Sequence, residues 1–456
     1  MTDRKAKREK FNSKFGVMMA MAGSAIGLGN MWRFPYLTAK SGGAAFILIY
    51  LLMMLFISLP AMITEYLVGR RSRANIFNSF AILGHPRWRF IGLFAVLATI
   101  FVLSFYSVVG GWALRYLVQA FQFKFDSTTA DYGTEFSSFV SSTFGPLGYT
   151  YLFLGLTAFV ISGGVKKGIE KFSKIMMSVL FVIIILVVIR SVTLPGAING
   201  LRYLFVPDFG KISIDTFMQA LGQAFFSLGL GCGAILVYGS YVKTETNIVN
   251  SAIQVAVLDT IFAIIAGIAI IPAIFAIAGM NGYEPDFNAG PGLVFITLPR
   301  IFAAMPLGSV IAILFFMSLL LAAITSAISI YEPIVAFIIE QWHKSRTKAV
   351  LIGFSICAIL ATFCSLSQGV MSGVKLFGYN IFDFFDNFSA TVLMTGSGLL
   401  LTVFAGWVMK KEDFMDELTS HGHFNRHKWL AKTVYILVKY VAPVGIFAII
   451  IGDFLL

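Results

Sequence analysis

The sequence divides into long apolar segments separated by short charged ones, and this division constrains the fold more than any other feature. A helix needs about 20 residues to cross a hydrocarbon core roughly 30 Å thick. About eleven segments come close to or exceed that length, the fourth being the shortest. They centre on residues 15–38, 45–69, 90–122, 149–163, 172–193, 216–240, 248–279, 308–340, 348–368, 378–408 and 430–455. Because backbone polar groups in hydrocarbon must be satisfied internally, we expect an all-α polytopic membrane protein.

Charged residues are scarce and lie mainly between these segments. They make up 12% of the chain, against 58% hydrophobic residues, which excludes an ordinary soluble globule. The net charge of +12 arises from Lys and Arg in alternate loops, so it indicates membrane orientation and no nucleic-acid partner. The basic clusters lie within residues 4–10, 70–89, 166–174, 344–348 and 410–428. The positive-inside rule predicts a multi-pass cell-membrane protein with a cytoplasmic N-terminus and, with eleven spans, an external C-terminus.

The first segment has an unusual centre, AMAGSAIGLGNMWRFP, at residues 20–35. A stretch this poor in helix formers survives at membrane depth only where it lines a cavity, because unpaired backbone groups are costly there. Its freed carbonyls can then bind a cation, and a half-helix end attracts the opposite charge. A close helix crossing is the alternative that the glycines alone would allow. Asn30 and Arg33 favour a functional site, because polar side chains within spans are costly.

The sixth segment repeats this pattern. Residues 219–241 read QALGQAFFSLGLGCGAILVYGSY, with Gly229, Gly231 and Gly233 alternating near the centre. Close helix packing is again the alternative. Two glycine-interrupted spans, five spans apart, are typical of transporters built from inverted repeats, in which the binding site lies at the two broken helices.

Five motifs, in order along the whole chain, closely resemble signatures of the neurotransmitter:sodium symporter family, which includes bacterial amino-acid transporters of the LeuT type. They match its first, second, third, sixth and eighth helices, and read GSAIGLGNMWRFPY (23–36), LPAMITEYLVGRRS (59–72), SFYSVVGGW (104–112), GQAFFSLGLGCGA (222–234) and AITSAISIYEP (323–333). The resemblance implies a LeuT-type 5+5 inverted repeat with the first and sixth helices broken. It also implies sodium-coupled import of an amino acid by alternating access. The chain departs from the family in its eleven spans, where twelve are usual, and in Ser178, where the fifth helix often carries a proline.

The resemblance further implies two sodium sites made of oxygen ligands, as suits a hard cation. The first site takes the Ala25 carbonyl and the side chains of Asn30, Ser227 and Asp259. The second site takes the carbonyls of Gly23, Ile26 and Ala322 with the hydroxyls of Thr325 and Ser326. Considered alone, those two hydroxyls would rather bond to the preceding turn of their own helix. Opposite a broken helix, they are better explained as ligands.

The same matches imply where an amino-acid substrate binds. Its carboxylate would lie at the amides of Leu28 and Gly29, at a half-helix N-terminus, and accept a hydrogen bond from Tyr106. The family's monoamine transporters carry an aspartate at the position of Gly27. Glycine leaves room there for a carboxylate and offers no counter-ion to a lone amine, which favours an amino acid.

The implied side-chain pocket favours large substrates. Gly229 and Cys232 match positions that are often larger, so we expect a bulky apolar or aromatic side chain. Phe226 and Ile330, taken alone, are better explained by core packing. The complete set of implied substrate-binding residues is Ala25, Gly27, Leu28, Gly29, Val102, Tyr106, Phe226, Ser227, Gly229, Cys232, Ser326 and Ile330.

Two charged pairs match the family's gates. Arg33 and Asp386 correspond to the extracellular pair, and Arg8 and Glu340 to the cytoplasmic pair, with Tyr241 nearby. An exposed ion pair contributes only about 0–1 kcal/mol, which suits a gate that must open in every cycle.

Two carboxylates within the spans need separate explanations. Glu65 must be paired, hydrogen-bonded or protonated at that depth, and we favour a structural tie between helices. Asp259 stands where the family has a neutral asparagine, in surroundings that hold chloride in many animal members. Ala263 replaces a glutamate that serves in place of the anion in some bacterial members. Because an ionised Asp259 would repel chloride, we predict chloride-independent transport; the alternative is a protonated Asp259.

The main alternative function is a receptor or channel on the same fold. An enzyme is weaker still, since no metal cluster, nucleophile elbow or phosphate loop is evident. A channel would need a continuous polar pore, whereas the polar groups gather at mid-depth. We therefore expect a symporter in the lipid bilayer that binds an amino acid and two sodium ions, with its oligomeric state open. We predict a cytoplasmic N-terminal tail at residues 1–12 and a single transporter domain at residues 13–456. Within this domain, the two inverted repeats cover about 13–195 and 214–410, and an extra helix covers 429–456.

Overall fold

The computed structural model describes residues 9–282, 285, 287, 290–422 and 428–455. Nine helices in this described part are long and apolar enough to cross a membrane. They are Ala44–Ser72, Pro86–Phe121, Phe144–Ser162, Val165–Val192, Ile248–Met280, Gly308–Trp342, Arg346–Leu366, Ile381–Val408 and Trp429–Gly452. Each overlaps one of the predicted segments, and the two remaining predicted segments are the two interrupted ones.

Several of these spans change their helical geometry along their length. Here α marks an α-helix, and η marks a tighter (3-10) or wider (π) helical turn. The first four spans consist of α3 (Ala44–Met53), η2 (Met54–Ser58), α4 (Leu59–Ser72), η3 (Pro86–Trp88), α6 (Arg89–Phe121), α8 (Phe144–Ser162), η4 (Val165–Glu170) and α9 (Lys171–Val192). The other five consist of α13 (Ile248–Asn281), α15 (Gly308–Trp342), α16 (Arg346–Leu366), α17 (Ile381–Asn387), η7 (Phe388–Met394), α18 (Thr395–Val403), η8 (Phe404–Val408), α20 (Lys428–Ile436), η10 (Leu437–Val441) and α21 (Ala442–Leu455). The connecting elements are α5 (Ile76–Ile82), α7 (Tyr132–Ser141), α10 (Ala197–Phe205), η5 (Phe209–Lys211), η6 (Leu293–Thr297), α14 (Leu298–Ala304), β1 (Lys375–Leu376), β2 (Tyr379–Asn380) and α19 (Lys411–Leu418).

The first segment is interrupted at its centre. Helix α1 (Lys14–Ala25) ends where Ile26 takes an extended conformation, with φ −75° and ψ 102°. The chain resumes as a π-helical turn, η1 (Gly29–Arg33), and continues as α2 (Phe34–Lys40). The residues between α1 and η1 are buried, so their backbone groups must find partners inside the protein or bind a ligand.

The sixth segment is interrupted by its glycines. Between α11 (Ile214–Ser227) and α12 (Ala234–Ser240), Gly229, Gly231 and Gly233 have φ values of 62°, 83° and 71°. A side chain disfavours this left-handed region, and a Cβ on Gly231 would also collide with the Met394 backbone. The Gly231 amide donates a 2.6 Å hydrogen bond to Oε1 of Glu65 in α4. Glu65 therefore ties two helices together, as the favoured interpretation expected.

The fifth span is an unbroken α-helix from Lys171 to Val192, without the family's proline. Its α-helical part, α9, follows the π-helical turn η4, which begins directly after Gly164, at φ 77°. The Ser178 hydroxyl donates to the Lys174 carbonyl at 2.9 Å, within the unbroken helix.

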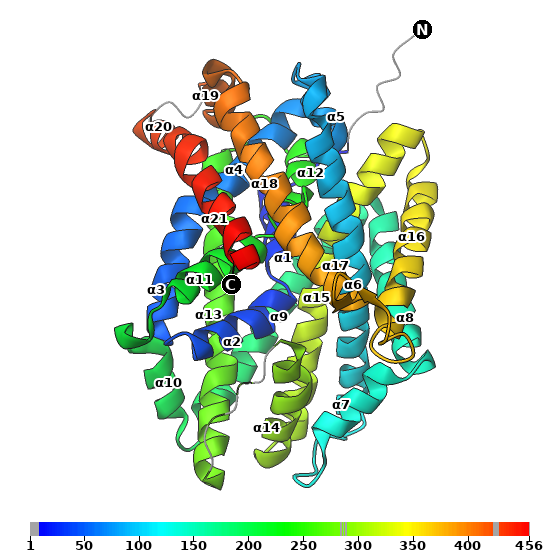
Figure 1. The fold of residues 1–456 in the computed structure, drawn as a ribbon, viewed down its shortest axis with the longest axis vertical. Helices are drawn as coiled ribbons and strands as arrows, with labels where there is room; N and C mark the ends of the chain where they lie inside the picture. The colour runs from blue at the N-terminus through cyan, green and yellow to red at the C-terminus, as the bar shows by residue number, and fades with distance from the viewer. Residues whose placement is uncertain (1–8, 283–284, 286, 288–289, 423–427, 456) are drawn as a thin grey trace.

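Helix α1 of the first broken segment lies near the centre of the molecule, among the long helices (Figure 1). Helix α1 packs against α9, α13 and α15, and α12 packs against α4. The short connecting helices α5 and α19 lie at one end of the molecule, and α7, α10 and α14 lie at the other (Figure 1). Loops that the charge pattern assigns to opposite sides of the membrane therefore lie at opposite ends.

Candidate functional site

The residues predicted for the second sodium site lie together at the break in the first segment. The Ser326 hydroxyl donates to the carbonyls of Gly23 and Ile26, at 3.1 and 3.0 Å. The Thr325 hydroxyl instead bonds within its own helix, to the Ala322 carbonyl at 3.0 Å. The Ser326 hydroxyl therefore faces the break, as expected of an ion ligand, whereas the Thr325 hydroxyl bonds to the preceding turn of its own helix, which is the alternative. All five groups present oxygen atoms and are buried, which is a donor set suited to a small hard cation.

The residues predicted for the first sodium site form a second buried polar cluster. Nδ2 of Asn30 donates to Oδ1 of Asp259 at 2.8 Å and to the Ser227 hydroxyl at 3.2 Å. That hydroxyl donates to Oδ2 of Asp259, also at 2.8 Å. Oδ1 of Asn30 accepts a hydrogen bond from the Gly27 amide at 3.1 Å, inside the break. Ala25, the last residue of α1, lines the small cavity beside this cluster.

The Asp259 carboxyl also lies among the residues that the sequence resemblance matches to a chloride site. The Tyr50 hydroxyl donates to Oδ2 of Asp259 at 3.3 Å. Gln223 is completely buried, and within the described part of the chain neither its amide oxygen nor its amide nitrogen has a hydrogen-bond partner. Asp259 is completely buried as well, so its charge acts at short range on anything bound beside it.

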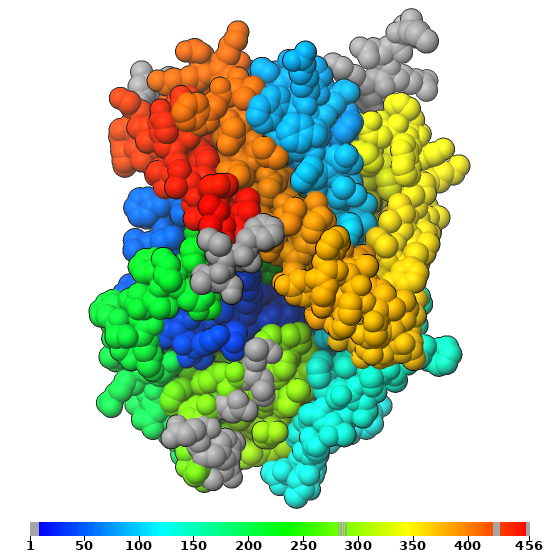
Figure 2. Space-filling view, in the orientation of Figure 1, coloured from blue at the N-terminus to red at the C-terminus, as the bar shows by residue number. Residues whose placement is uncertain are grey.

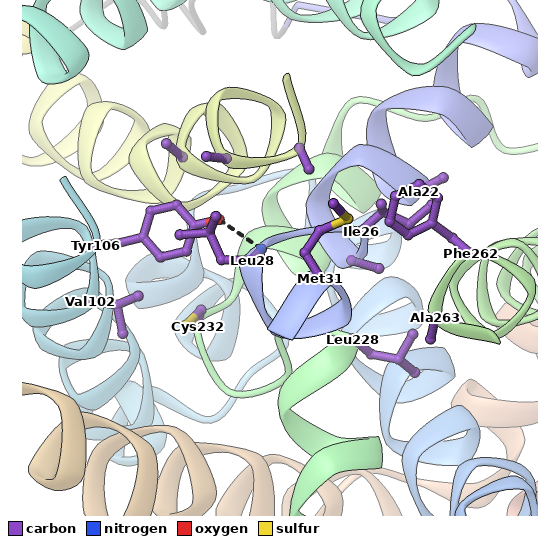
Figure 3. Packing of buried hydrophobic residues seen from close by; sticks show 14 of the residues in the cluster. Ala22, Ile26, Leu28, Met31, Val102, Tyr106, Leu228, Cys232, Phe262 and Ala263 are labelled. Carbon is purple, nitrogen blue, oxygen red and sulfur yellow. Dashed lines mark hydrogen bonds between the residues drawn. The ribbon is translucent and has the colours of Figure 1, made fainter. Parts of the chain in front are cut away.

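All twelve predicted substrate-binding residues line one small cavity of about 50 Å³ between the broken segments. Figure 3 shows Val102 and Tyr106 of α6 approaching Leu28 of the first break, with Cys232 of the second break beside them. The Leu28 amide donates to the Tyr106 hydroxyl at 3.4 Å, a long hydrogen bond that a carboxylate accepting from both groups would replace. The remaining lining residues are Ser24, Asn30, Ala234 and Met394.

Gly27 lies close to two hydroxyl groups of this site. A Cβ atom at this position would be 2.7 Å from the Ser326 hydroxyl and 3.1 Å from the Tyr106 hydroxyl. Such contacts are too short for a carbon atom to fit without displacing them. Any side chain at residue 27 would therefore separate the two hydroxyls and fill the space beside the break.

A larger cavity, of about 640 Å³, lies directly next to the small one. Both cavities are lined by Leu28, Gly29, Tyr106 and Phe226, so the two aromatic rings stand between them. Arg33 and Asp386 lie in the wall of the larger cavity, and the Arg33 guanidinium is 5.2 Å from the centre of the Phe226 ring. Figure 2 shows the molecule hollowed between the blue segment that contains α2 and the gold segment that contains α17.

The predicted cytoplasmic pair is only partly visible. Arg8 lies outside the described residues. Glu340 accepts hydrogen bonds from the Asn75 amide, at 3.0 and 3.1 Å, and from the Asn78 side chain at 3.3 Å. It therefore holds the beginning of α5 against the end of α15.

A second charged network at the same end was missed by the sequence reasoning. Arg346, at the start of α16, binds Oε2 of Glu332 at 2.6 Å and Oε1 of Glu9 at 3.6 Å. The Tyr241 hydroxyl donates to Oε1 of Glu332 at 2.7 Å. A sequence signal existed, because a carboxylate within a span is costly and marks a functional position by default. The sequence alone places Arg346 only in a basic loop.

Comparisons with known proteins agree with this architecture. The model of the sodium:neurotransmitter symporter family matches residues 8–143 and 142–455. The chain is 38% identical over 443 residues to YhdH of Bacillus subtilis, an uncharacterized sodium-dependent transporter, covering 96% of each chain. It is 34% identical over 471 residues to an uncharacterized sodium-dependent transporter of Haemophilus influenzae, covering 99% of this chain and 100% of the relative.

Among solved structures, the chain is similar to that of MhsT in complex with L-phenylalanine. The TM-score is 0.87 at 38% identity, covering 98% of this chain and 100% of MhsT. This match confirms the predicted LeuT-type fold. The family match and the sodium-dependent relatives confirm the predicted membership and the use of sodium. The chain belongs to the sodium:neurotransmitter symporter family, which comprises secondary transporters of the membrane and not enzymes.

Proposed function

We propose that this transporter imports a bulky apolar or aromatic amino acid together with two sodium ions. The observation that carries the proposal is the gathering of all twelve predicted contact residues around one cavity at the two broken helices. That cavity offers backbone amides and the Tyr106 hydroxyl to a carboxylate, and an apolar wall that includes Val102 and Ile330 to a side chain. MhsT, which shares the fold, was solved with L-phenylalanine, and this supports the proposed substrate class.

The two buried oxygen clusters support the proposed ion number. One cluster includes the Asp259 carboxyl, which offsets the charge of a cation. The other is built from neutral carbonyls and hydroxyls, and both adjoin the break after α1. An amino acid and the ions would thus share one interruption of the helix, so the binding of each favours the binding of the others.

Alternating access follows from the positions of the cavities and the charged networks. The large cavity leads to the Tyr106 and Phe226 rings from one side. At the other end, the Phe11 amide donates to the Tyr241 carbonyl at 3.2 Å, beside the Arg346 network. If the N-terminus is cytoplasmic, this arrangement is open to the outside and closed to the cytoplasm. Sodium and substrate can shift it only through their different affinities for the two states.

We also propose that transport is independent of chloride. The Asp259 carboxyl accepts hydrogen bonds from Asn30, Ser227 and Tyr50. A negative charge at this position offsets the charge of a neighbouring sodium ion, which is the role that chloride would otherwise have.

The test of the proposed function is accumulation of labelled amino acids by proteoliposomes under an inward sodium gradient. Binding of the common amino acids, with and without sodium, would first select the substrate. A symporter concentrates its substrate above the external level only while the gradient persists. A receptor would bind without accumulation, and a channel would only equilibrate the substrate, so either outcome would refute the proposal.

Cys232 is expected to limit the size of the side-chain pocket. A Cys232→Phe change should weaken the binding of tryptophan and tyrosine relative to leucine by about tenfold or more, because overfilling a packed site costs about 1–3 kcal/mol. Competition of each amino acid against a labelled substrate would measure this, with Cys232→Ala as the control that keeps the space. Unchanged relative affinities would remove Cys232 from the pocket wall.

Glu332 is expected to hold the cytoplasmic side closed. Its carboxyl is fully buried against Arg346, so Glu332→Gln should favour the state that opens towards the cytoplasm. Sodium binding would weaken by about 5- to 150-fold, the range of a coupling free energy of 1–3 kcal/mol. Sodium titration of substrate binding measures the effect, with Glu412→Gln as the control, because Glu412 is an exposed carboxylate of α19 at the same end of the molecule. Equal sodium affinities in the parent and Glu332→Gln would contradict this role.

A further inference from the structure

A β-hairpin stands at the rim of the large cavity. Leu376 of β1 pairs with Tyr379 of β2, so Phe377 and Gly378 alone form the turn. Their φ values are 52° and 91°. A two-residue hairpin turn of this kind favours asparagine and glycine, and a bulky residue at positive φ costs stability. Phe377 is also 90% exposed, so burial of its ring does not offset that cost.

The Phe377 ring begins a series of stacked rings. It stacks on Phe384, with centroids 5.8 Å apart and planes 23° apart, and Phe384 stacks on Phe388 at 5.2 Å and 13°. We call Phe377, Phe384 and Phe388 the aromatic ladder. All three line the large cavity, whose lining also includes Tyr106 and Phe226 next to the small cavity. Aromatic rings therefore line this cavity both at the hairpin and beside the binding site, together with polar residues such as Asp386 and Asn387.

The hairpin is fixed to the helix that carries the rest of the ladder. Asn380 ends β2 and is the N-cap of α17, where its side-chain oxygen accepts a hydrogen bond from the Asp383 amide at 2.8 Å. The ring at the tip is thus held by a tight turn on one side and by a capped helix on the other. Such a pre-organised ring can contact a ligand without first losing conformational entropy.

We propose that the aromatic ladder captures the aromatic side chain of the incoming amino acid before it reaches the central site. Folding alone favours a different residue at position 377, whereas an exposed ring at the cavity mouth offers a surface on which a second ring can stack. The contact stabilises the encounter and the passage inwards, and it leaves the bound state unchanged. This inference rests on the proposed function and adds the route by which aromatic substrates enter.

The consequence is a specific kinetic signature. The ladder contacts the substrate during entry and exit and not in the bound state. Its removal therefore lowers the association and dissociation rate constants by the same factor and leaves the equilibrium affinity unchanged. Phe377→Asn suits the turn and removes the ring. For phenylalanine, both rate constants should fall by about 2- to 10-fold, the value of one aromatic pair. For leucine, both should stay within about twofold, because no ring is available to stack.

The experiment uses the full-length protein in detergent or nanodiscs, with sodium present. Stopped-flow fluorescence, excited above the absorbance of phenylalanine, would follow Trp32, which lines the large cavity. Leu307→Asn is the matched control: Leu307 has φ 63°, is 73% exposed, and is not among the described residues that line the cavity. The melting temperature of Phe377→Asn should equal or exceed that of the parent.

The outcomes separate this inference from the proposed function. Equal falls of both rate constants for phenylalanine alone would support the ladder. Unchanged rate constants for phenylalanine, a changed equilibrium affinity, or the same change for leucine would overturn it. A parent protein that binds no amino acid would instead refute the proposed function, and the ladder with it.

Discussion

Replacing both Thr325 and Ser326 with alanine is expected to abolish sodium-dependent substrate binding at physiological sodium concentrations, while the protein remains folded. The double change removes two of the five oxygen groups at the second cluster. A hydrogen bond or ligand contact to a charged group contributes about 1.5–3 kcal/mol. Two such losses weaken ion binding on the order of a hundredfold or more.

The structure indicates why the fold should tolerate this change. The Thr325 hydroxyl bonds to a carbonyl of its own helix that is already part of the helical ladder. The Ser326 hydroxyl donates to the carbonyls of Gly23 and Ile26 at the end of α1, so its loss removes contacts at the break and no backbone bond within a helix. The measurement is a sodium titration of labelled-substrate binding. Ser318→Ala is the control, because this buried hydroxyl on the same helix bonds only to Phe315 among the hydrogen bonds of α15 described here.

A double mutant with the sodium dependence of the parent would show that the second cluster holds no sodium. Loss of binding at every sodium concentration, together with a lowered melting temperature, would indicate damage to the fold. A binding curve displaced to higher sodium, at an unchanged melting temperature, is the expected result.

The membrane spans could be predicted from hydropathy, because the bilayer sets both the length and the apolar character of a helix within it. Helix ends could be predicted less well. The fourth span begins at Phe144, before the predicted start at residue 149, because Pro146 is tolerated in the first turn of a helix. Both breaks could be predicted from their glycine-rich centres, whereas the exact residue at which α1 ends, Ile26, carries no such signal.

Most contact residues of the sodium and substrate sites could be placed because they belong to ordered motifs, and Val102, Asp259 and Ala322 were placed from the resemblance of the whole chain. The cytoplasmic network could not, because it joins the end of α15 to the start of α16 across a change of direction in the chain. Glu332 and Arg346 each had a visible signal, but their pairing depends on how those two helices pack.

The aromatic ladder was missed for a similar reason. Phe377, the exposed ring, occupies a turn position with positive φ that phenylalanine disfavours. The local sequence therefore gives no hairpin signal there.

Asp259→Asn is expected to convert a chloride-independent transporter into a chloride-dependent one. At about 4 Å and an effective dielectric constant near 20, two unit charges interact by roughly 4 kcal/mol. An ionised carboxylate at this position therefore stabilises a neighbouring sodium ion and repels chloride. Each interaction is large enough to decide whether that ion binds. An asparagine keeps an oxygen ligand for sodium but no charge.

The surroundings of Asp259 favour its ionised form when sodium is bound. Burial alone favours the protonated acid, which is the competing interpretation. Three donors, the Asn30 amide and the hydroxyls of Ser227 and Tyr50, point at the carboxylate and oppose that effect. A sodium ion in the same cluster adds an opposite charge at short range. Proton release on sodium binding is then expected wherever the empty site holds the protonated form.

In the Asp259→Asn variant, the chloride would lie beside the Tyr50 hydroxyl and the Gln223 amide. That amide is buried without a hydrogen-bond partner among the described residues, so its N–H groups are available to an anion. Uptake in sodium chloride and in sodium gluconate should be equal for the parent. For Asp259→Asn, uptake should fall by about tenfold or more in gluconate, as expected when a charge interaction worth several kcal/mol is lost.

Restoring a carboxylate one helical turn away tests the same argument independently. Ala263→Glu, added to Asp259→Asn, returns a negative charge to the side of the cluster where some bacterial family members carry one. Uptake by this double variant should again be equal in the two salts. Parent uptake that collapses in gluconate would refute the assignment of Asp259. Chloride dependence that appears with Asp259→Asn and disappears with the second change would show that one fixed charge at this position replaces the anion.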